Sequence, residues 1–328
     1  MSETIKKIGV LTSGGDAPGM NAAIRAVVRT CAFHNIECFG IYRGYQGMIE
    51  GDFKEMGARS VNNIVNKGGT VLKSARSKEF MTIEGRQKAH KHLVAAGIEA
   101  LVVIGGDGSF TGAEIFNAEF NFPVMGIPGT IDNDIFGTSH TLGYDTALNT
   151  VVEVIDKIRD TASSHNRLFF VEVMGRDAGH IALNAGIGAG AEEILIPEED
   201  LGLERLVESL QKSKASGKSS SIVVVAEGDK MGKNVFELKD YVEEHMPEYD
   251  VRVSVLGHMQ RGGAPSCFDR VLASRLGVKA VESLLEGKSN FMVGIMQDEI
   301  TLTPLELAIK GHYPIDKELL RVSDIMST

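Results

Sequence analysis

The sequence contains few cysteines, no long hydrophobic run and no excess of positive charge. Its three cysteines, Cys31, Cys38 and Cys267, are odd in number and do not have the spacing of metal ligands. A chain of 328 residues does not need disulfides to fold. We therefore expect reduced thiols and a cytoplasmic protein.

The absence of long hydrophobic runs and of excess positive charge excludes several classes of protein. No uninterrupted apolar stretch approaches the length of a bilayer span, so no membrane span is predicted. The apolar run near the N-terminus is short and is followed by glycines, so no secretory signal is predicted. The 34 basic residues are outnumbered by 44 acidic ones, for a formal net charge of -10. This argues against nonspecific binding to nucleic acid or anionic lipid and predicts small-molecule ligands.

The sequence does contain short apolar, β-branched runs that alternate with amphipathic segments over nearly its whole length. Strands are predicted at 7–12, 37–42, 100–106, 122–128, 168–175, 192–197, 221–228 and 252–257. Helical periodicity marks 84–96, 143–161, 201–215 and 265–286. The alternation predicts an α/β fold, and the length favours two similar three-layer α/β/α domains with mainly parallel sheets.

Three glycine-rich stretches follow predicted strands: "TSGGDAPGMN", "GGDGSFTG" and "MGRDAGH". Parallel sheets bind ligands at the carboxyl ends of their strands, where backbone N–H groups can hold phosphate. Neither the Rossmann glycine spacing nor the Walker lysine is present. In the second stretch Asp107 lies between Gly106 and Gly108, where its carboxylate either holds a magnesium ion or caps the next helix.

The stretch "PGTIDNDIFGT" at residues 128–138 places Thr130, Asp132 and Asp134 at alternate positions. In an extended segment these side chains would point to the same side. Loop aspartates commonly form turns with their own backbone. Beside phosphate-binding loops, the pattern also fits phosphoryl transfer, in which one carboxylate accepts a hydroxyl proton and the other lies near the cation.

Arginines lie within or beside the glycine-rich and strand-end segments, where positive charge would meet phosphate. Any one of them could instead form a surface ion pair, but as a group they favour an anionic ligand. The six residues are Arg25, Arg76, Arg167, Arg176, Arg252 and Arg261.

Several motifs occur together and in a fixed order. They are "GVLTSGGDAPGMNAAIR", "GGTVLKSAR", "VVIGGDGS", "PGTIDNDI", "SSHNR", "VEVMGR" and "VLGHMQRGG". From about residue 5 to 310 the sequence resembles the bacterial ATP-dependent 6-phosphofructokinases. The resemblance implies phosphorylation of fructose 6-phosphate at its 1-hydroxyl, the committed step of glycolysis, with Mg²⁺ as cofactor and an active site in the cleft between two domains. It also implies domains of 1–142 plus 259–309, for ATP, and 143–258 plus 310–328, for fructose 6-phosphate.

The resemblance also assigns site residues by motif. The nucleotide site falls on Gly15, Tyr45, Arg76, Ser77, Gly106, Asp107, Gly108 and Ser109, with Asp107 as magnesium ligand. The sugar site falls on Thr130, Asp132, Asp134, Met174, Gly175, Arg176, Glu227, His258 and Arg261, with Arg167 and Arg252 reaching it from a neighbouring subunit of a homotetramer. Asp132 is implied to be the general base, Arg176 to stabilise the transition state and Thr130 to position the hydroxyl.

Two glycines distinguish the donor, and other positions bear on regulation. Pyrophosphate-dependent relatives have Asp and Lys where Gly108 and Gly129 stand, so ATP is predicted. The family's site for ADP and phosphoenolpyruvate falls on Arg25, Arg29, Arg59, Arg159, Gly190, Glu192 and Lys218. Ser219 and Ser220 replace a basic cluster, and Ala58 replaces an arginine. The lost charges predict attenuated regulation.

Three other functions remain as alternatives. A pyrophosphate-dependent phosphofructokinase would share most of the motifs. A lipid or NAD kinase with the "GGDG" loop would share the phosphate site but not "PGTIDND", "MGR" or "QRGG". A nonenzymatic nucleotide sensor would be expected to lack the base or the magnesium ligand, whereas Asp107, Asp132 and Arg176 are all present.

Overall fold

The structure, a computed structural model, describes residues 5–162, 167–199, 202–215, 221–228 and 234–327. The chain divides into two compact units. Unit 1 comprises Met1–Ile131, Ile135–Thr146 and Arg261–Tyr313, and unit 2 comprises Asp132–Asp134, Ala147–Gln260 and Pro314–Thr328. The chain therefore crosses between the units on either side of Asp132–Asp134 and again after Thr146, Gln260 and Tyr313. The sequence analysis expected crossings near 142, 258 and 309.

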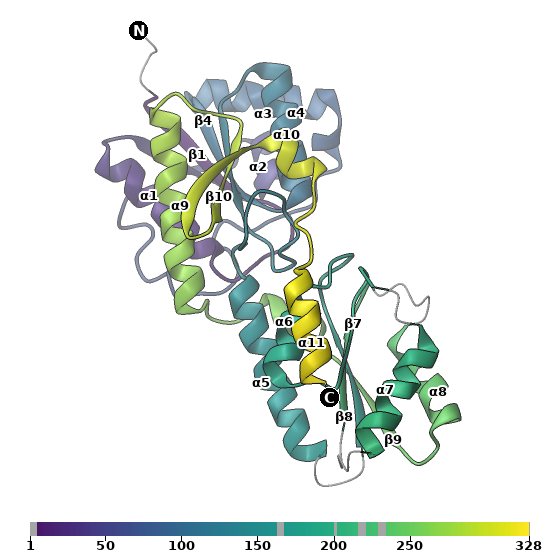
Figure 1. Cartoon of the computed structure of the whole chain (residues 1–328). Coiled ribbons are helices and arrows are strands. Elements are labelled where there is room, and N and C mark those ends of the chain that lie inside the picture. Colours follow the sequence, from purple (N-terminus) through teal and green to yellow (C-terminus); the bar gives the residue numbers. More distant parts are fainter. Residues whose placement is uncertain (1–4, 163–166, 200–201, 216–220, 229–233, 328) are drawn as a thin grey trace. The chain divides into compact units, whose positions relative to one another are not determined.

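Unit 1 is built on a seven-stranded sheet (Figure 1). In spatial order its strands are β11 (Glu299–Pro304), β10 (Phe291–Met296), β5 (Val124–Pro128), β4 (Ala100–Gly105), β1 (Lys7–Thr12), β2 (Glu37–Ile41) and β3 (Phe53–Glu55). The strands from β10 to β2 are parallel, and β11 and β3 pair antiparallel at the two edges. Because β4 and β5 are buried along their whole length, they can be continuously apolar.

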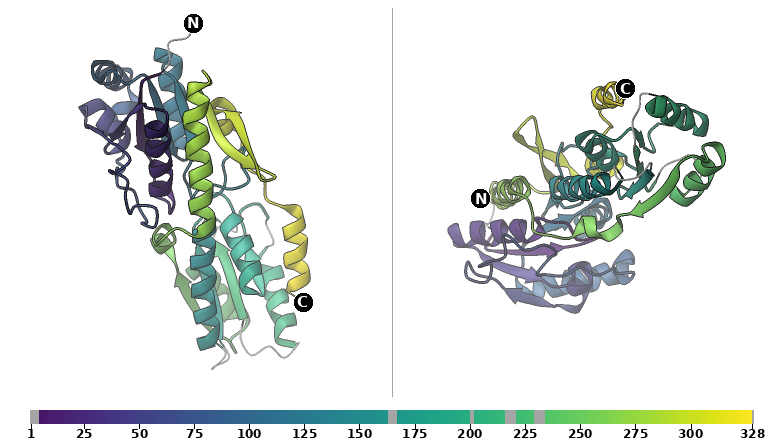
Figure 2. Two further views of the ribbon diagram at one scale, coloured as in Figure 1. Left: turned by 90° about the vertical axis from the view of Figure 1, so that its left-hand side faces the viewer. Right: turned by 90° about the horizontal axis from the view of Figure 1, so that it is seen from below.

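Helices cover both faces of this sheet. On one face α1 (Met20–Phe33) and α9 (Cys267–Leu285) lie side by side (Figure 2). On the other face, side chains of four helices and one short 3₁₀ helix form a single core with the strands. These are α2 (Gly44–Glu50), η1 (Glu79–Met81), α3 (Ile83–Ala96), α4 (Asp107–Phe120) and α10 (Leu305–Lys310).

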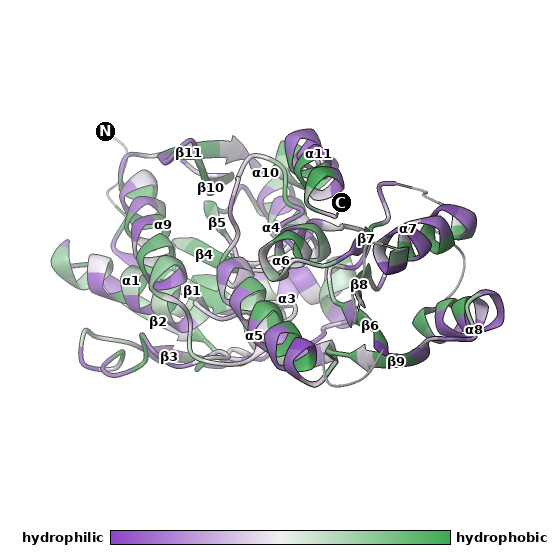
Figure 3. Cartoon of the chain, turned by 60° about the horizontal axis from the view of Figure 1, so that its bottom comes forward, coloured by the Kyte–Doolittle hydropathy of each residue, from purple (hydrophilic) through white to green (hydrophobic). Residues whose placement is uncertain are grey.

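Unit 2 repeats the three-layer arrangement on a smaller sheet. Its four parallel strands, in spatial order, are β7 (Glu193–Leu195), β8 (Ser221–Ala226), β6 (Arg167–Val173) and β9 (Asp250–Val255). Its helical elements are most of α5 (Tyr144–Ala162), α6 (His180–Ala189), α7 (Leu203–Ala215), α8 (Val235–His245), η2 (Gly257–Arg261) and α11 (Lys317–Met326). Hydrophobic side chains of α7 and α8 pack on the sheet. Figure 3 shows hydrophobic and hydrophilic residues alternating around α5, as expected for a helix with one buried face.

The predicted α/β fold is confirmed, and so are the eight predicted strands, within a few residues at their ends. Three strands were missed: β3, β10 and β11. None of the helices among the described residues is long and apolar enough to cross a membrane.

A buried carboxylate in unit 1 links the starts of two helices. Asp269, which is fully buried, accepts hydrogen bonds from the N–H groups of Gly143 and Thr146, both at 2.9 Å, and from the Thr146 hydroxyl. The Ser266 hydroxyl caps α9 by accepting the Asp269 N–H at 3.2 Å. Burial raises the pKa of Asp269, while the hydrogen bonds from Thr146 and Gly143 oppose this rise. One side chain thus joins α9 to the first turn of α5.

We expect Asp269→Ala to lower the free energy of unfolding by about 2–6 kcal/mol, because two buried N–H groups lose their acceptor at about 1–3 kcal/mol each. Urea denaturation followed by circular dichroism measures the loss. The matched control is Asp316→Ala, which removes the exposed cap of α11 and should cost about 0.5–2 kcal/mol. Equal losses in the two variants would contradict a special role for Asp269.

Candidate active site

Three turns of unit 1 meet at the carboxyl edge of its sheet, where the adjacent parallel strands β1, β4 and β5 end. The N–H of Ser13 donates to the carbonyl of Ile104 at 3.0 Å, and the N–H of Gly129 donates to the carbonyl of Gly105 at 2.9 Å. These bonds hold the "TSGG", "GGDG" and "PGT" turns together. This is the edge at which parallel sheets bind ligands.

The glycines of the "GGDG" turn have different physical roles. A Cβ on Gly105 would lie 2.4 Å from the Ser109 Oγ and 2.6 Å from the carbonyl oxygen of Ser13, so no larger residue fits there. A Cβ on Gly108 would meet no atom within 4 Å. Packing therefore requires Gly105, whereas Gly108 leaves open space beside the turn.

Asp107 is the first residue of α4, and the N-cap position belongs to Gly106, which makes no side-chain cap. The carboxylate of Asp107 therefore lies in the first helical turn, where the partial positive charge of the helix favours an anion. Its side chain is half-buried at the strand end. A carboxylate oxygen is the donor type that magnesium prefers, so the residue fits the predicted metal ligand.

Tyr45, from α2, supports the "GGDG" turn from the buried side. Its hydroxyl donates to the carbonyl of Ser109, and its ring stacks on Phe80 with centroids 4.1 Å apart. Burial raises the pKa of Tyr45, so its phenol remains a donor. Because Tyr45 is only 7% exposed, it contributes to the predicted nucleotide site mainly by positioning Ser109.

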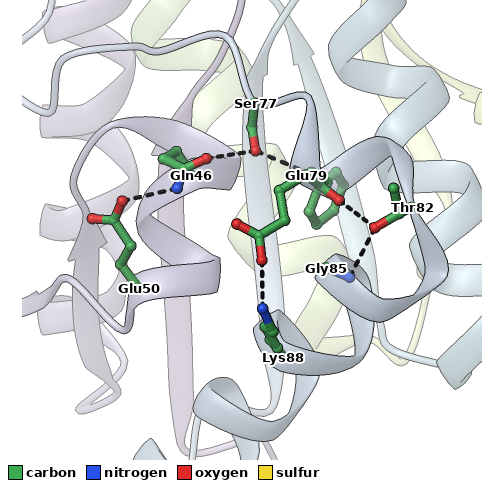
Figure 4. Close-up of polar contacts among 8 residues, drawn as sticks. Gln46, Glu50, Ser77, Glu79, Thr82, Gly85 and Lys88 are labelled. Atoms are coloured by element: carbon green, nitrogen blue, oxygen red, sulfur yellow. Dashed lines mark hydrogen bonds and ion pairs between the residues drawn. The ribbon is translucent and has the colours of Figure 1, made fainter.

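The hydroxyl of Ser77 forms hydrogen bonds within the protein (Figure 4). It donates to Gln46 Oε1 at 2.7 Å and accepts the N–H of Phe80 at 3.2 Å, while Gln46 Nε2 donates to Glu50 Oε1 at 2.8 Å. The neighbouring Arg76 is exposed. Of these two predicted nucleotide ligands, Arg76 is the one that presents its side chain to solvent.

Figure 4 also shows how the chain continues from Ser77 into α3. Thr82 caps this helix by accepting the N–H of Gly85 at 3.1 Å, and its own hydroxyl donates to the carbonyl of Glu79 at 2.8 Å. Lys88 pairs with the Glu79 carboxylate at 2.7 Å. These local contacts fix the segment that follows Arg76 and Ser77.

The stretch after β5 is bent, so the expectation of an extended 130–134 segment is wrong. The backbone bends at residues 131–132, and Asn133 has a left-handed φ of 53°. Thr130 belongs to unit 1, where its carbonyl accepts the Thr141 hydroxyl at 2.6 Å, and Asp132 belongs to unit 2. Asn and Asp tolerate such turns because their short side chains bond locally.

In unit 2, Asp132 forms an ion pair with Arg176. The Arg176 Nε lies 3.3 Å from Asp132 Oδ2; the Asp132 side chain is 1% exposed and that of Arg176 is 60% exposed. A buried carboxylate requires such a positive partner. The pair joins the predicted base to the predicted transition-state arginine.

The backbone around Arg176 has an unusual conformation. Gly175 has a φ of 143° and Arg176 a left-handed φ of 55°. The N–H of Arg176 donates to Glu227 Oε1 at 2.9 Å. A Cβ on Gly228 would lie 1.8 Å from the carbonyl oxygen of Arg176, so this glycine allows β8 to approach the turn. Left-handed geometry at a non-glycine residue costs about 1–2 kcal/mol, and these contacts offset that cost.

Arg167 and Arg252 flank a carboxylate that the sequence analysis did not identify. Arg167 Nε lies 3.0 Å from Asp250 Oδ2, and Arg252 lies 2.9 Å from Asp250 Oδ1. Arg167 is the larger cause of a lowered Asp250 pKa. The register of β6 and β9 places Arg167 opposite Asp250. Only that register, which links residues far apart in sequence, could have revealed the cluster.

His258 and Arg261 lie on η2. His258 is exposed. In unit 1, Arg261 donates to the carbonyl of Asp16 at 3.4 Å, and a Cβ on Gly15 would lie 2.7 Å from its guanidinium. Arg261, predicted for the sugar site, therefore also contacts the loop predicted for the nucleotide. Asp134, Met174 and Glu227 are in unit 2.

Some of the predicted effector residues already form hydrogen bonds or ion pairs within the protein. Arg159 donates to the carbonyls of Ala189 at 2.8 Å and Gly190 at 2.6 Å, and lies 3.7 Å from Glu192. Glu192 Oε2 accepts the N–H of Ile222 at 2.6 Å. In unit 1, Arg25 is half-buried, Arg59 is exposed and Arg29 donates to Asn62 Oδ1 at 3.3 Å. Lys218, Ser219 and Ser220 lie outside the described residues.

Known proteins resemble the chain over nearly its full length. It is 54% identical over 319 residues to ATP-dependent 6-phosphofructokinase 2 of Bacteroides thetaiotaomicron, covering 97% of this chain and 98% of that protein. It is also 54% identical over 323 residues to ATP-dependent 6-phosphofructokinase 1 of Thermus thermophilus, covering 98% of this chain and 100% of that one.

Solved structures show the same fold. Phosphofructokinase of Saccharomyces cerevisiae matches with a TM-score of 0.87 and 39% identity over 98% of this chain and 46% of that longer chain. A pyrophosphate-dependent phosphofructokinase of Marinobacter aquaeolei has a TM-score of 0.83 at 22% identity, over 96% of this chain and 86% of the other, which supports the fold alone. The family model for phosphofructokinase matches residues 7–284. The chain therefore belongs to the phosphofructokinase family.

Proposed function

We propose that the protein transfers the γ-phosphoryl group of ATP to the 1-hydroxyl of fructose 6-phosphate, giving fructose 1,6-bisphosphate and ADP. The relatives that are 54% identical over 98–100% of their length are ATP-dependent 6-phosphofructokinases. The observation that carries the proposal is the ion pair of the buried Asp132 with the exposed Arg176. A base beside a cation that faces solvent suits transfer of a phosphoryl group to a hydroxyl.

In this reaction Asp132 takes the proton of the 1-hydroxyl as that oxygen bonds to the γ-phosphorus and the bond to ADP breaks. Arg176 offers its guanidinium to the oxygens of the transferring group, where negative charge is greatest in the transition state. Asp134 adds a second carboxylate near the base, and Thr130 positions the hydroxyl. Met174 and Gly175 continue the sugar surface.

The donor side uses the three turns of unit 1. The start of α4, where the helix carries partial positive charge, and the loop at Gly15 are suited to hold phosphate, and the exposed Arg76 adds positive charge. Asp107 would hold Mg²⁺, which, when bound, neutralises phosphate charge. Gly108 leaves space for the nucleotide, and a side chain at Gly129 would press on Met20 at 3.1 Å and Ile104 at 3.2 Å. The open space at Gly108, and a glycine instead of lysine at Gly129, favour ATP over pyrophosphate as donor.

The sugar phosphate would bind to His258 and Arg261, with Arg167 and Arg252 supplied by a neighbouring subunit of a tetramer. The two strand arginines already share Asp250. A phosphate with more charge than one carboxylate would draw both guanidinium groups away from Asp250. The Asp250 cluster therefore keeps the two arginines together until substrate arrives.

We expect Asp132→Asn to lower kcat by about 10²- to 10⁴-fold, the usual cost of losing a general base, with little change in the KM for ATP. Steady-state kinetics with fructose 6-phosphate measures this loss. Asp240→Asn, which neutralises an exposed carboxylate on α8 with 75% side-chain exposure, is the matched control and should retain wild-type rates. Full turnover by the Asp132 variant would rule out its role as the base.

We expect Gly108→Asp to weaken ATP use by at least about tenfold, because the new carboxylate would face phosphate, and like charges brought together cost several kcal/mol. The melting temperature should hold, since a Cβ at Gly108 meets no atom within 4 Å. Gly57→Asp, where the space is equally open, controls for the added charge. The donor-loop assignment fails if both variants use ATP alike.

We expect hyperbolic dependence on fructose 6-phosphate and weak responses to ADP and phosphoenolpyruvate. Each missing charge contact costs about 1.5–3 kcal/mol, or roughly 10- to 100-fold in effector affinity. Ala58→Arg should strengthen the ADP response, whereas Ala58→Met, of similar length without charge, should not. Strongly sigmoidal kinetics in the wild type, relieved by ADP, would contradict attenuated regulation.

A further inference from the structure

The turn that carries Arg176 is held by side chains from other segments of unit 2. The N–H of Met174 donates to Gln260 Oε1 at 3.2 Å, and the N–H of Arg176 donates to Glu227 Oε1 at 2.9 Å. Gln260 lies 86 residues along the chain from Met174, and Glu227 lies 51 residues from Arg176. The backbone of the turn is therefore fixed by long-range bonds while the guanidinium faces solvent.

The far end of the same turn has its own support. The N–H of Gly179 donates to both carboxylate oxygens of Glu198, at 2.9 and 3.1 Å. Within the turn the N–H of Ala178 donates to the carbonyl of Gly175 at 3.0 Å. Hydrogen bonds therefore hold both ends of the turn that contains Arg176, and the fixed backbone limits the directions that the arginine side chain can take.

Gln260 differs from the other two supports because it is fully buried and uses both ends of its amide. Its Nε2 donates to the carbonyl of Gly257 at 3.0 Å, and its Oε1 accepts from Met174. A buried amide is costly unless its groups are bonded. Here the two bonds tie the short helix η2 to the start of the Arg176 turn.

We propose that Gln260 is a positioning residue that couples the sugar-phosphate segment at His258 to the turn of Arg176. The proposal rests on the proposed function. His258 lies two residues before Gln260 on η2, so a phosphate held there also fixes the helix that carries Gln260. The fixed amide then holds the Met174 N–H, and the arginine is presented to the transferring group.

This arrangement lets phosphate binding, remote from the reacting hydroxyl, improve the rate as well as the affinity. Neither Glu227 nor Glu198 can do the same, since neither belongs to η2. Glu227 directly follows β8, and Glu198 lies after β7. Gln260 is thus the support that links the phosphate segment to the arginine.

The test compares Gln260→Met, which keeps side-chain length but removes both hydrogen bonds, with Gln211→Met on an exposed position of α7. We expect Gln260→Met to lower kcat by about 10- to 100-fold, the effect of a small misplacement of a catalytic group, with the KM for ATP unchanged. Gln211→Met should match the wild type. An unchanged kcat in a folded Gln260→Met protein overturns the proposal.

Hydrogen exchange supplies a readout that does not depend on turnover. In the wild type, fructose 6-phosphate should slow amide exchange in peptides covering residues 174–179. In Gln260→Met, exchange there should be faster without ligand, and added fructose 6-phosphate should no longer slow it. Equal protection in both proteins, with or without ligand, overturns the proposal.

A second variant covers a failure of Gln260→Met to fold. Gln260→Glu keeps an oxygen that can accept the Met174 N–H and loses the donor to Gly257, so exchange at residues 174–179 should stay slower than in a variant without any acceptor, such as Gln260→Leu. Equal exchange in these two variants overturns the proposal.

The proposed function and the coupling fail in different ways. A wild-type protein that cannot phosphorylate fructose 6-phosphate would overturn the proposed function. An active wild-type protein whose kcat and amide exchange do not change when Gln260 is replaced would overturn only the coupling.

Discussion

The ion pair between Asp132 and Arg176 sets the main constraint on unit 2. A carboxylate with 1% side-chain exposure has lost nearly all its water, and its partner is 60% exposed. Removing a charge from water is costly unless an opposite charge replaces the water. The arginine can do so only if its backbone is held at the right place, which explains the left-handed φ at Arg176 and the carboxylate and glycine that support it. The geometry of the turn thus follows from the requirement that the buried Asp132 carboxylate be paired with a positive charge.

In unit 1 the main constraint is the close packing of the turns at the carboxyl edge of the sheet. The glycines there divide by physical cause: Gly105 is excluded from carrying a side chain by Ser13 and Ser109, whereas Gly108 has open space. Tyr45 supports the same turn from below, because its hydroxyl donates to the carbonyl of Ser109. Side chains below the turn thus fix the backbone that is proposed to hold the donor phosphates.

Much of this fold could be predicted because buried parallel strands are continuously apolar, as in β4 and β8. Strands β3, β10 and β11 were missed because a three-residue edge strand and an antiparallel hairpin next to a long helix give weak patterns. The motifs indicated Asp132 and Arg176, but the bend after Thr130 was misjudged as extended, since local alternation cannot reveal the φ of Asn133. Gln260, Asp250 and Glu198 depend on contacts between distant segments, which no local pattern contains.

The site residues predicted from motifs differ in whether a ligand would displace water or protein hydrogen bonds from them. Arg76 and His258 are exposed, so a ligand that meets them replaces mainly water. Arg159 is already bonded to the carbonyls that end α6, where a cation also meets the partial negative charge of the helix. An effector phosphate that bound Arg159 would have to compete with these contacts. They add to the missing charges as a reason to predict attenuated regulation, because a guanidinium whose hydrogen bonds the fold already satisfies has less to offer a ligand.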